Sequence, residues 1–279
     1  MKIVLITGLS GSGKSVALAV MEDAGFYCVD NLPVPLVRSL LDVLQRSGNE
    51  RIALAIDART GSSVTELPAL TEALRESGHD VRVIYLEAKD DTLIKRYSET
   101  RRRHPLAQEG MTLPECIARE REMVTGLSAT GHHIDTSDLR PGTLRQWVKD
   151  FVAAERNDLT LLFESFGYKH GVPLDADFVF DVRCLPNPYY DPGLRPLTGL
   201  DQPVRDYLHS LPESGKMLDD ISRFLRDWLP AFRRDNRSYL AVAIGCTGGQ
   251  HRSVFFCEEL STRFRNGENV LTRHRGLGQ

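Results

Sequence analysis

The chain has 279 residues, 41% hydrophobic and 26% charged, which is typical of a globular protein with one large domain or two ordinary ones. A formal net charge of −3 excludes a polycation, so any nucleic-acid contact requires a local basic patch. The five cysteines lack C-x-x-C spacing, so we expect neither structural zinc nor a disulfide framework. The apolar runs are too short to span a bilayer, and the first strand leaves no room for a signal peptide. We therefore expect a cytoplasmic protein without membrane contact.

In the first half of the chain, short apolar runs alternate with longer helical patterns. Such alternation indicates βαβ units around a parallel sheet, and it predicts an N-terminal α/β domain over residues 1–154. The predicted strands are 2–6, 26–29, 51–56, 81–86 and 132–135. The predicted helices lie near 14–23, 34–46, 64–77, 90–101, 114–127 and 142–154.

A glycine-rich segment joins the first strand to the first helix and fits the P-loop pattern G-x-x-x-x-G-K-[ST]. Its glycines allow successive N–H groups to point at an anion, and the helix N-terminus adds a positive field. Lys14 can reach the β- and γ-phosphates, and the Ser15 hydroxyl can bind Mg²⁺ carried by the nucleotide. The predicted nucleotide-binding residues here are Gly8, Leu9, Ser10, Gly11, Ser12, Gly13, Lys14 and Ser15.

A P-loop protein usually needs a second acid at the end of a neighbouring strand to hold the water shell of Mg²⁺. Asp57 follows the run 52–56 and fits this role, so we group it with Lys14 and Ser15 as a candidate catalytic residue. Asp30 is the rival, and either acid could instead cap a helix or a turn. Both would lie at the carboxyl edge of the sheet.

The run 95–105 is the most cationic stretch of the first half. Small P-loop kinases place arginines in a mobile lid, where they neutralise charge on the transferred phosphoryl group. A solvated helix end explains the same charges equally well, because cations suit a helix C-terminus.

The second half predicts a second α/β domain over residues 158–279. Its predicted strands are 159–167, 177–183 and 239–244, and its predicted helices lie near 217–233 and 251–265. Residues 184–203 are rich in proline, glycine and aspartate but contain interspersed apolar side chains. We therefore expect an ordered functional loop rather than a linker there.

A second anion-binding candidate, with the sequence IGCTGGQHRS, follows the strand 239–244. A glycine-rich turn at a helix N-terminus, with His251 and Arg252 converging on it, suits a phosphate monoester. Cys246 and Arg252 also have the C-x5-R spacing of phosphatases that use a thiolate nucleophile, although no general acid is evident nearby. We favour ligand binding over catalysis.

The segment 261–279 contains four arginines, Arg263, Arg265, Arg273 and Arg275, against one acid, Glu268. A basic end of this kind is either a solvated tail or a contact for RNA. The candidate RNA-binding residues are Arg265, Arg273, His274 and Arg275.

These segments together resemble the bacterial RapZ-type family of P-loop nucleotide-binding proteins, and the resemblance spans nearly the whole chain. It is carried by the P-loop joined to EDAGFYCVDNLP (22–33), by DVRCLPNP (181–188), by LRPLTG (194–199) and by GCTGGQHRS (245–253). Tyr189 stands where some members have histidine, and the chain ends at Gln279 without the lysine-rich end of some RNA-binding members.

The resemblance implies a kinase-like P-loop domain that binds and slowly hydrolyses ATP or GTP with Mg²⁺, followed by a domain with a phosphofructokinase-like sheet. The second domain would sense a phosphorylated amino sugar resembling glucosamine-6-phosphate and bind a small regulatory RNA that is presented to an endoribonuclease. Asp57, Ala58, Arg59 and Thr60 fall on a segment assigned to GTP contact. The implied sugar-phosphate residues are Tyr189, Thr247, Gly248, Gly249, His251, Arg252 and Ser253.

Three functions therefore stay open at this point. The leading one is a regulatory ATPase or GTPase with a ligand-sensing, RNA-binding second domain, expected to form a homo-oligomer. The alternatives are a small-molecule kinase that uses the P-loop and an arginine-rich lid, and a phosphatase centred on Cys246.

Overall fold

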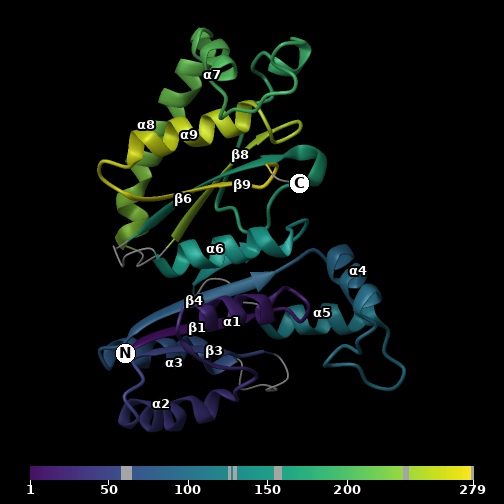
Figure 1. Ribbon diagram of the computed structural model, residues 1–279, viewed down its shortest axis with the longest axis vertical. Helices are drawn as coiled ribbons and strands as arrows, with labels where there is room; N and C mark the ends of the chain where they lie inside the picture. The colour runs from purple at the N-terminus through teal and green to yellow at the C-terminus, as the bar shows by residue number, and fades with distance from the viewer. Residues whose placement is uncertain (58–64, 125–126, 128–130, 154–158, 235–238, 278–279) are drawn as a thin grey trace. The chain divides into compact units, whose positions relative to one another are not determined.

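The computed structural model describes residues 1–57, 65–124, 127, 131–153, 159–234 and 239–277. The chain forms two compact units, Met1–Ala154 and Glu155–Gln279, and each is described by itself (Figure 1). Among the described residues, no helix has the length and apolar character needed to cross a membrane.

The N-terminal unit is built on a five-stranded parallel sheet in the order β2-β3-β1-β4-β5, which confirms the predicted fold class. β1 is central and pairs with β3 on one side and with β4 on the other. The loop that follows β1 therefore begins in the middle of the carboxyl edge of the sheet. The strands are β1 (Lys2–Gly8), β2 (Tyr27–Val29), β3 (Arg51–Ala55), β4 (Asp80–Glu87) and β5 (His132–Asp135).

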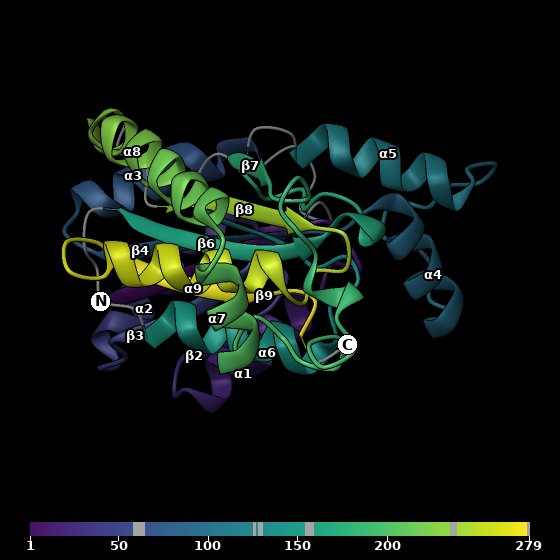
Figure 2. The ribbon, with the colours of Figure 1, turned by 90° about the horizontal axis from the view of Figure 1, so that it is seen from above.

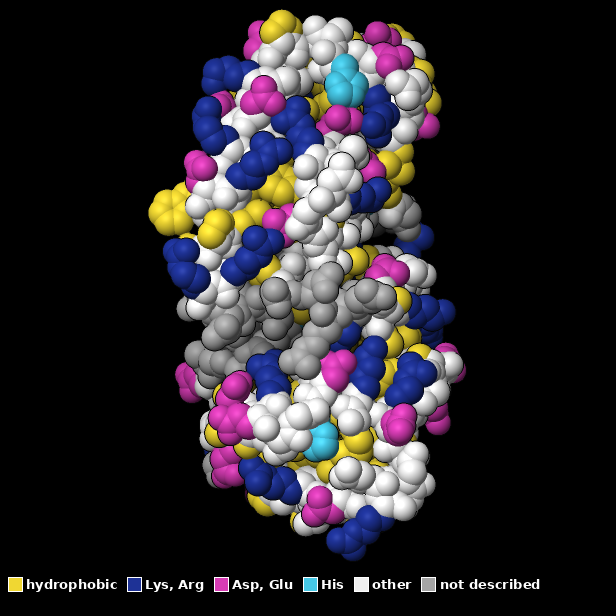
Figure 3. Space-filling model, turned by 90° about the vertical axis from the view of Figure 1, so that its left-hand side faces the viewer, with side chains coloured by type: hydrophobic (Ala, Val, Ile, Leu, Met, Phe, Trp, Pro, Cys, Tyr) yellow, Lys and Arg dark blue, Asp and Glu magenta, His cyan; other side chains and the backbone are white. Residues whose placement is uncertain are grey.

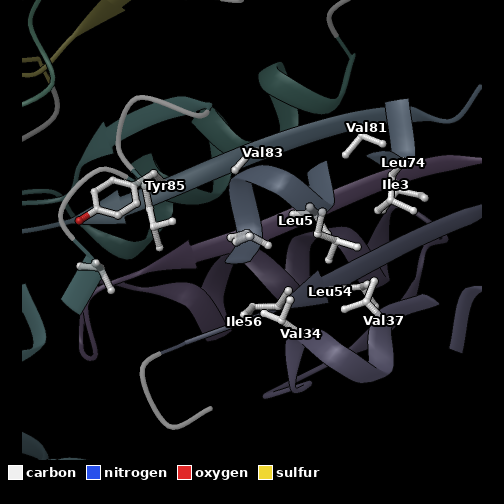
Figure 4. Close-up of a cluster of buried hydrophobic side chains, with 14 of the residues drawn as sticks. Ile3, Leu5, Val34, Val37, Leu54, Ile56, Leu74, Val81, Val83 and Tyr85 are labelled. Carbon is white, nitrogen blue, oxygen red and sulfur yellow. The ribbon is translucent and has the colours of Figure 1, made fainter. Parts of the chain in front are cut away.

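The helices of this unit bury alternate side chains of the strands. Ile3 and Leu5 of β1 belong to an apolar cluster that also holds Val37 and Leu74 from two helices (Figure 4). The next residues along β1 are equally buried, so both faces of the sheet are covered. The helices are α1 (Lys14–Asp23), α2 (Val37–Arg46), α3 (Leu67–Glu76), α4 (Asp90–Thr100), α5 (Leu113–Val124) and α6 (Pro141–Ala153), with a 3₁₀ turn η1 (Val34–Leu36) before α2.

The C-terminal unit has a four-stranded parallel sheet in the order β7-β8-β6-β9. Its described helices α7, α8 and α9 lie over one face of this sheet (Figure 2). The strands are β6 (Thr160–Gly167), β7 (Phe178–Asp181), β8 (Tyr239–Cys246) and β9 (Asn269–His274). The helices are α7 (Gln202–His209), α8 (Pro212–Arg234) and α9 (Arg252–Phe264), with 3₁₀ turns η4 (Tyr168–His170) and η5 (Pro188–Tyr190).

The C-terminal segment is a strand of the sheet and not a basic tail. β9 pairs in parallel with β6 from Asn269 to His274. Arg273 is buried, and Arg275 makes an ion pair with Glu164 of β6 at 3.4 Å. A periodicity analysis missed this strand because its charges are neutralised only by residues distant in sequence. Removing the residues after Gly267 would delete a strand of the sheet. A truncation at that point would therefore disturb the fold and could not test RNA binding alone.

Candidate functional site

The segment Gly8–Lys14 curls from the end of β1 into the start of α1. Gly8 has φ +129°, and a Cβ atom there would lie 1.9 Å from the backbone oxygen of Leu86 in β4. Gly13, the residue before α1, has φ +111°, and a Cβ atom there would lie 2.7 Å from Leu144 of α6. Both positions require glycine, because other residues would meet steric strain and a clash at once. The first N–H groups of α1 are thus presented beside the loop, as a phosphate site requires.

Lys14 lies folded against the loop. Its Nζ donates to the backbone oxygens of Gly8 at 2.8 Å and Leu9 at 3.1 Å, and lies 3.9 Å from Oδ2 of Asp57. Asp57 is buried just past the end of β3, the neighbour of β1. Asp30, its rival, is exposed after the edge strand β2. The contacts therefore favour Asp57 as the acid that faces the P-loop.

Oxygen donors are available for a nucleotide-bound cation. Ser15 begins the first turn of α1 beside Lys14, and Asp57 provides a carboxylate near the same loop. Hydroxyl and carboxylate oxygens are ligands that Mg²⁺ prefers, and phosphates of a nucleotide supply others. Within the described residues, no group of three or more His, Cys, Asp or Glu side chains is arranged to hold a metal ion by itself. Ala58, Arg59 and Thr60, predicted as nucleotide contacts, lie outside the described residues.

Two side chains hold the outward carbonyl groups of the P-loop. Arg96 of α4 donates to the backbone oxygen of Gly11 at 3.0 Å and to both the hydroxyl and the carbonyl of Thr136. The Thr136 hydroxyl, just past β5, lies 2.8 Å from the backbone oxygen of Ser12. Because the Ser12 carbonyl faces Thr136, the Gly13 N–H of the same peptide points the other way, whereas the Ser12 N–H donates to the Leu9 oxygen at 3.1 Å. Arg96, for which the sequence left a kinase lid and a solvated helix end open, contacts the loop and positions it.

A fully buried carboxylate, Glu120 of α5, binds the P-loop from another side. Its two oxygens accept hydrogen bonds from the backbone N–H of Ser10 at 2.9 Å and the Ser10 hydroxyl at 2.7 Å. His104 Nε2 lies 3.2 Å from the same carboxylate, and His104 Nδ1 accepts from the N–H of Leu106. The donor at His104 is therefore Nε2–H.

Burial raises the pKa of Glu120, but the His104 hydrogen bond, the charge of Lys14 and both Ser10 bonds outweigh it. The pKa is lowered overall, so this buried acid is held as an anion. Sequence reasoning missed Glu120, His104 and Thr136, because no local motif marks a residue that meets the P-loop from another helix or strand.

The second glycine-rich turn follows β8 and leads into α9. The Cys246 thiol is 3% exposed; its Sγ accepts from the N–H of Gly249 at 3.2 Å and lies 3.2 Å from the Ser253 hydroxyl. Gly249 has φ +76°, and a Cβ atom there would lie 2.7 Å from the backbone nitrogen of Gly167. The thiol thus packs inside the turn and stabilises it through these contacts. It is not accessible as the nucleophile that the phosphatase hypothesis requires.

Arg252 is also largely committed to the protein. Its Nη1 donates to the backbone oxygens of Arg183 at 3.0 Å and Leu185 at 2.7 Å, and Nη2 lies 3.5 Å from the Thr247 hydroxyl. The buried His251 ring contacts the backbone oxygen of Leu194. Both side chains therefore join the turn to the loop 183–199. Thr247 itself is exposed, and Gly248 has open space where a side chain would be.

Further cations surround this turn, and the sequence reasoning did not select them as site residues. The backbone N–H of Lys169, after β6, donates to the oxygen of Thr247, and the Lys169 side chain is exposed. Arg183, after β7, stacks over the Tyr168 ring at 3.8 Å and pairs with Asp181 at 2.7 Å. The Arg183 bond lowers the pKa of Asp181. All these groups lie at the carboxyl ends of β6, β7 and β8, where open parallel sheets collect ligands.

The loop 183–199 contributes an exposed aromatic side chain to the same region. Tyr189 is 50% exposed, and the Arg195 guanidinium lies 4.7 Å from its ring centre. Arg195 also donates to the Tyr189 backbone oxygen at 3.1 Å. The predicted ordered loop thus has a defined conformation that places a tyrosine and a cation together.

The four predicted RNA-binding residues have different environments. Arg265 is exposed just after α9. His274 lies 2.9 Å from the Ser165 hydroxyl and 3.0 Å from the Glu258 carboxylate. Arg273 is buried and Arg275 is paired with Glu164. These four side chains do not form one exposed basic surface.

Comparison with protein families gives two matches that together cover most of the chain. Residues 1–156 match the RapZ-like N-terminal domain, and residues 159–278 match the RapZ C-terminal domain. A protein of Azoarcus sp. named nucleotide-binding protein is 60% identical, covering 100% of this chain and 96% of the relative. A protein of the same name from Thiobacillus denitrificans is 57% identical, covering 99% and 100%.

Two solved kinase structures resemble about half of this chain. A sugar kinase from Janibacter sp. shares 18% identity with a TM-score of 0.39, covering 55% of this chain and 94% of that one. A shikimate kinase from Acinetobacter baumannii shares 15% identity with a TM-score of 0.38, covering 55% and 93%.

The buried Glu120 carboxylate gives a pH-dependent prediction. We expect Glu120→Gln to lower the free energy of unfolding by about 1–3 kcal/mol, because an amide leaves buried donors of Ser10 or His104 unpaired. Since the folded-state pKa of Glu120 is lowered, its stabilisation is present above the unfolded-state pKa and is lost as pH falls through the folded-state value. Denaturant titrations should therefore show a difference between parent and variant that shrinks towards acid pH.

The matched control is Glu122→Gln, which changes an exposed carboxylate on the same helix. It should alter the free energy of unfolding by less than about 0.5 kcal/mol. A Glu120→Gln effect no larger than this, or one independent of pH, would contradict the assigned role.

Proposed function

The chain belongs to the RapZ-like family, and from this membership we propose that it is a regulatory protein that binds and slowly hydrolyses ATP or GTP with Mg²⁺. The observation that supports this proposal most directly is the P-loop itself. Arg96 holds the Gly11 carbonyl and Thr136 holds the Ser12 carbonyl, α1 begins directly after Gly13, and Lys14 Nζ lies 3.9 Å from Asp57 Oδ2. Lys14 and a bound Mg²⁺ would neutralise charge on the phosphates, and Asp57 would hold the water shell of the ion.

The first test concerns Lys14. Lys14→Ala should weaken Mg²⁺-nucleoside triphosphate binding roughly tenfold to hundredfold, because a charge-assisted contact contributes about 1.5–3 kcal/mol. Monophosphate binding should weaken less, since a monophosphate does not extend to the lysine, and hydrolysis should fall with triphosphate binding. Calorimetry with ATP, GTP and their monophosphates measures these differences.

Lys149→Ala is the control, because Lys149 is an exposed lysine of α6 in the same unit. Equal triphosphate affinity in the parent and Lys14→Ala would refute the assignment. Transfer of the γ-phosphate to a small acceptor, rather than to water, would replace the regulator by the kinase alternative.

For the C-terminal unit we propose a site for a phosphorylated amino sugar such as glucosamine-6-phosphate. The N–H groups at the start of α9 and the exposed Thr247 hydroxyl would bind the phosphate. Lys169 and Arg183 would add positive charge, and the exposed ring of Tyr189 would pack on the sugar. The remaining predicted residues Gly248, Gly249, His251, Arg252 and Ser253 would shape the turn.

Lys169→Ala and Arg183→Ala should each weaken glucosamine-6-phosphate binding by roughly tenfold or more, as expected for loss of one charged hydrogen bond. Cys246→Ser should retain binding, because a hydroxyl can accept from Gly249 as the thiol does. Calorimetry of these variants, with the exposed Arg223→Ala on α8 as control, tests the site. Unchanged affinity in both cation variants would exclude this location, and phosphate release that depends on Cys246 would restore the phosphatase alternative.

We further propose that the protein binds a small regulatory RNA, presents it to an endoribonuclease and assembles into a homo-oligomer. Exposed arginines support an RNA contact near the C-terminal ends of α8 and α9, namely Arg234 and Arg265, with Arg233 paired to Glu268 between them. Figure 3 shows Lys and Arg side chains gathered on one face of this unit. We propose that this surface, which keeps Arg265 from the predicted set, binds RNA in place of the buried Arg273 and the paired Arg275.

Contact with about three phosphates of a single-stranded region would give a slope near −2 for log K against log salt. Arg234→Ala combined with Arg265→Ala should bring the slope close to about −1 and lower RNA affinity. Gel-shift titrations at several salt concentrations measure both. Lys216→Ala, at the opposite end of α8, should leave the slope unchanged, and an unchanged slope in the double variant would exclude this surface.

A further inference from the structure

A pocket outside the P-loop is lined by residues of α4, of α5 and of the loop that joins them. Figure 1 shows where these two helices lie in the N-terminal unit. Its volume is about 310 Å³, which is at the lower end of the range for sites that bind small molecules. The sequence analysis treated the cationic part of this loop only as a kinase lid or a helix end. Neither the nucleotide site nor the sugar-phosphate site proposed above uses the pocket.

Two guanidinium groups line this pocket. Arg102 and Arg103 are both exposed, and within the described part of the chain neither makes an ion pair or a hydrogen bond. Adjacent guanidinium groups without protein partners keep their donors available for an anion, and their planar shape suits bidentate binding of phosphate or carboxylate. The pocket therefore has a charged side that would attract an acidic group.

The rest of the lining combines aromatic and apolar surface with the polar side chains of Ser98 and Gln108. The Tyr97 ring lies 5.2 Å from the His104 ring, and Met111, Leu113 and Cys116 add sulfur and aliphatic surface. A planar ring suits the side of the pocket where the Tyr97 ring and the Met111 thioether offer surfaces on which it can stack. The charged side and this lining together describe a ligand with an anionic end and a planar apolar body.

We propose that this pocket binds a small organic phosphate with a planar ring, at a site separate from the P-loop. Arg102 and Arg103 bind the phosphate oxygens, and the ring stacks against Tyr97 with Met111 and Leu113 beneath it. The inference goes beyond the proposed function, because it does not require nucleotide hydrolysis or sugar-phosphate binding.

The pocket shares side chains with the P-loop environment. A Cβ atom on Gly11 would lie 3.3 Å from the Tyr97 ring, so Tyr97 packs on the loop as well as lining the pocket. His104 lines the pocket and contacts Glu120, which holds Ser10. A ligand that fixes Tyr97 and His104 therefore acts on the same residues that shape the nucleotide site. Binding at the two sites is coupled, and the coupling is reciprocal.

Phenyl phosphate is a suitable probe, because it has one phosphate and one planar ring, and inorganic phosphate is its ring-free control. Ligand-observed NMR titrations should use the full chain carrying Lys14→Ala, so that the P-loop does not dominate phosphate binding. We expect phenyl phosphate to bind at least tenfold more tightly than inorganic phosphate. Equal affinity of the two probes would overturn the proposal.

Three variants in that background locate the site. Arg102→Ala combined with Arg103→Ala should weaken phenyl phosphate binding at least tenfold. Ala107→Phe, which keeps the backbone and fills the pocket, should do the same. Arg145→Ala, which removes an exposed arginine of α6, should change nothing, and unaltered affinity in the first two variants would overturn the proposal.

The result is independent of the proposed nucleotide function. If the chain bound no nucleotide, phenyl phosphate binding at this pocket would still depend on Arg102 and Arg103. In the parent protein, saturating nucleotide should change the phenyl phosphate affinity by the same factor as phenyl phosphate changes the nucleotide affinity. If saturating nucleotide left the phenyl phosphate affinity unchanged, the proposed coupling would be wrong. The location of the pocket would still be tested by the variants described above.

Discussion

The unpaired N–H groups at the beginning of a helix are the feature on which the proposed anion sites of both units depend. In each unit a glycine-containing turn leads from a buried parallel strand into a helix, β1 into α1 and β8 into α9. The first N–H groups of a helix have no partner within it, and they need an oxygen from a side chain, water or a ligand. Neither Gly13 before α1 nor His251 before α9 makes a side-chain cap. These ends are therefore chemically prepared for phosphate oxygens.

The buried charged side chains that fix the conformation of such a turn need hydrogen-bond or ion-pair partners of their own. Around the P-loop, the protein balances Lys14 and Arg96 with backbone carbonyls, and it brings the carboxylates of Asp57 and Glu120 close to the same loop. Burying any one of these charges alone would cost more than a single hydrogen bond returns. The arrangement is stable because each group has partners already placed by rigid elements. Around the second turn, the Cys246 sulfur accepts from the Gly249 N–H, and the Arg252 guanidinium donates to the backbone carbonyls of Arg183 and Leu185.

Local sequence was sufficient to predict the P-loop, the N-terminal parallel sheet and the glycine-rich turn after β8. Each depends on neighbouring residues, such as an apolar run followed by glycine and lysine. Glu120, Thr136 and β9 could not be predicted in this way, because their roles depend on contacts across the fold. From the sequence alone, Arg273 is expected to be an exposed surface charge. In the structure β9 pairs with β6, and Arg273 is buried. α7 was missed for a different reason, because its eight residues are too few to show a clear helical periodicity.

The pairing of β6 with β9 has a consequence for how the chain acquires its structure during synthesis. β6 has β8 on one side and β9 on the other, and both partners follow it only after long intervening segments. β6 is buried along its whole length in the folded protein. Until β8 and β9 have been synthesised, both edges of this apolar strand lack hydrogen-bonding partners. The N-terminal sheet is completed before β6 is made, so this unit can finish folding first. The apolar strand edges of this protein are therefore exposed longest while the C-terminal half is being made, and association with other chains is most favoured during that interval.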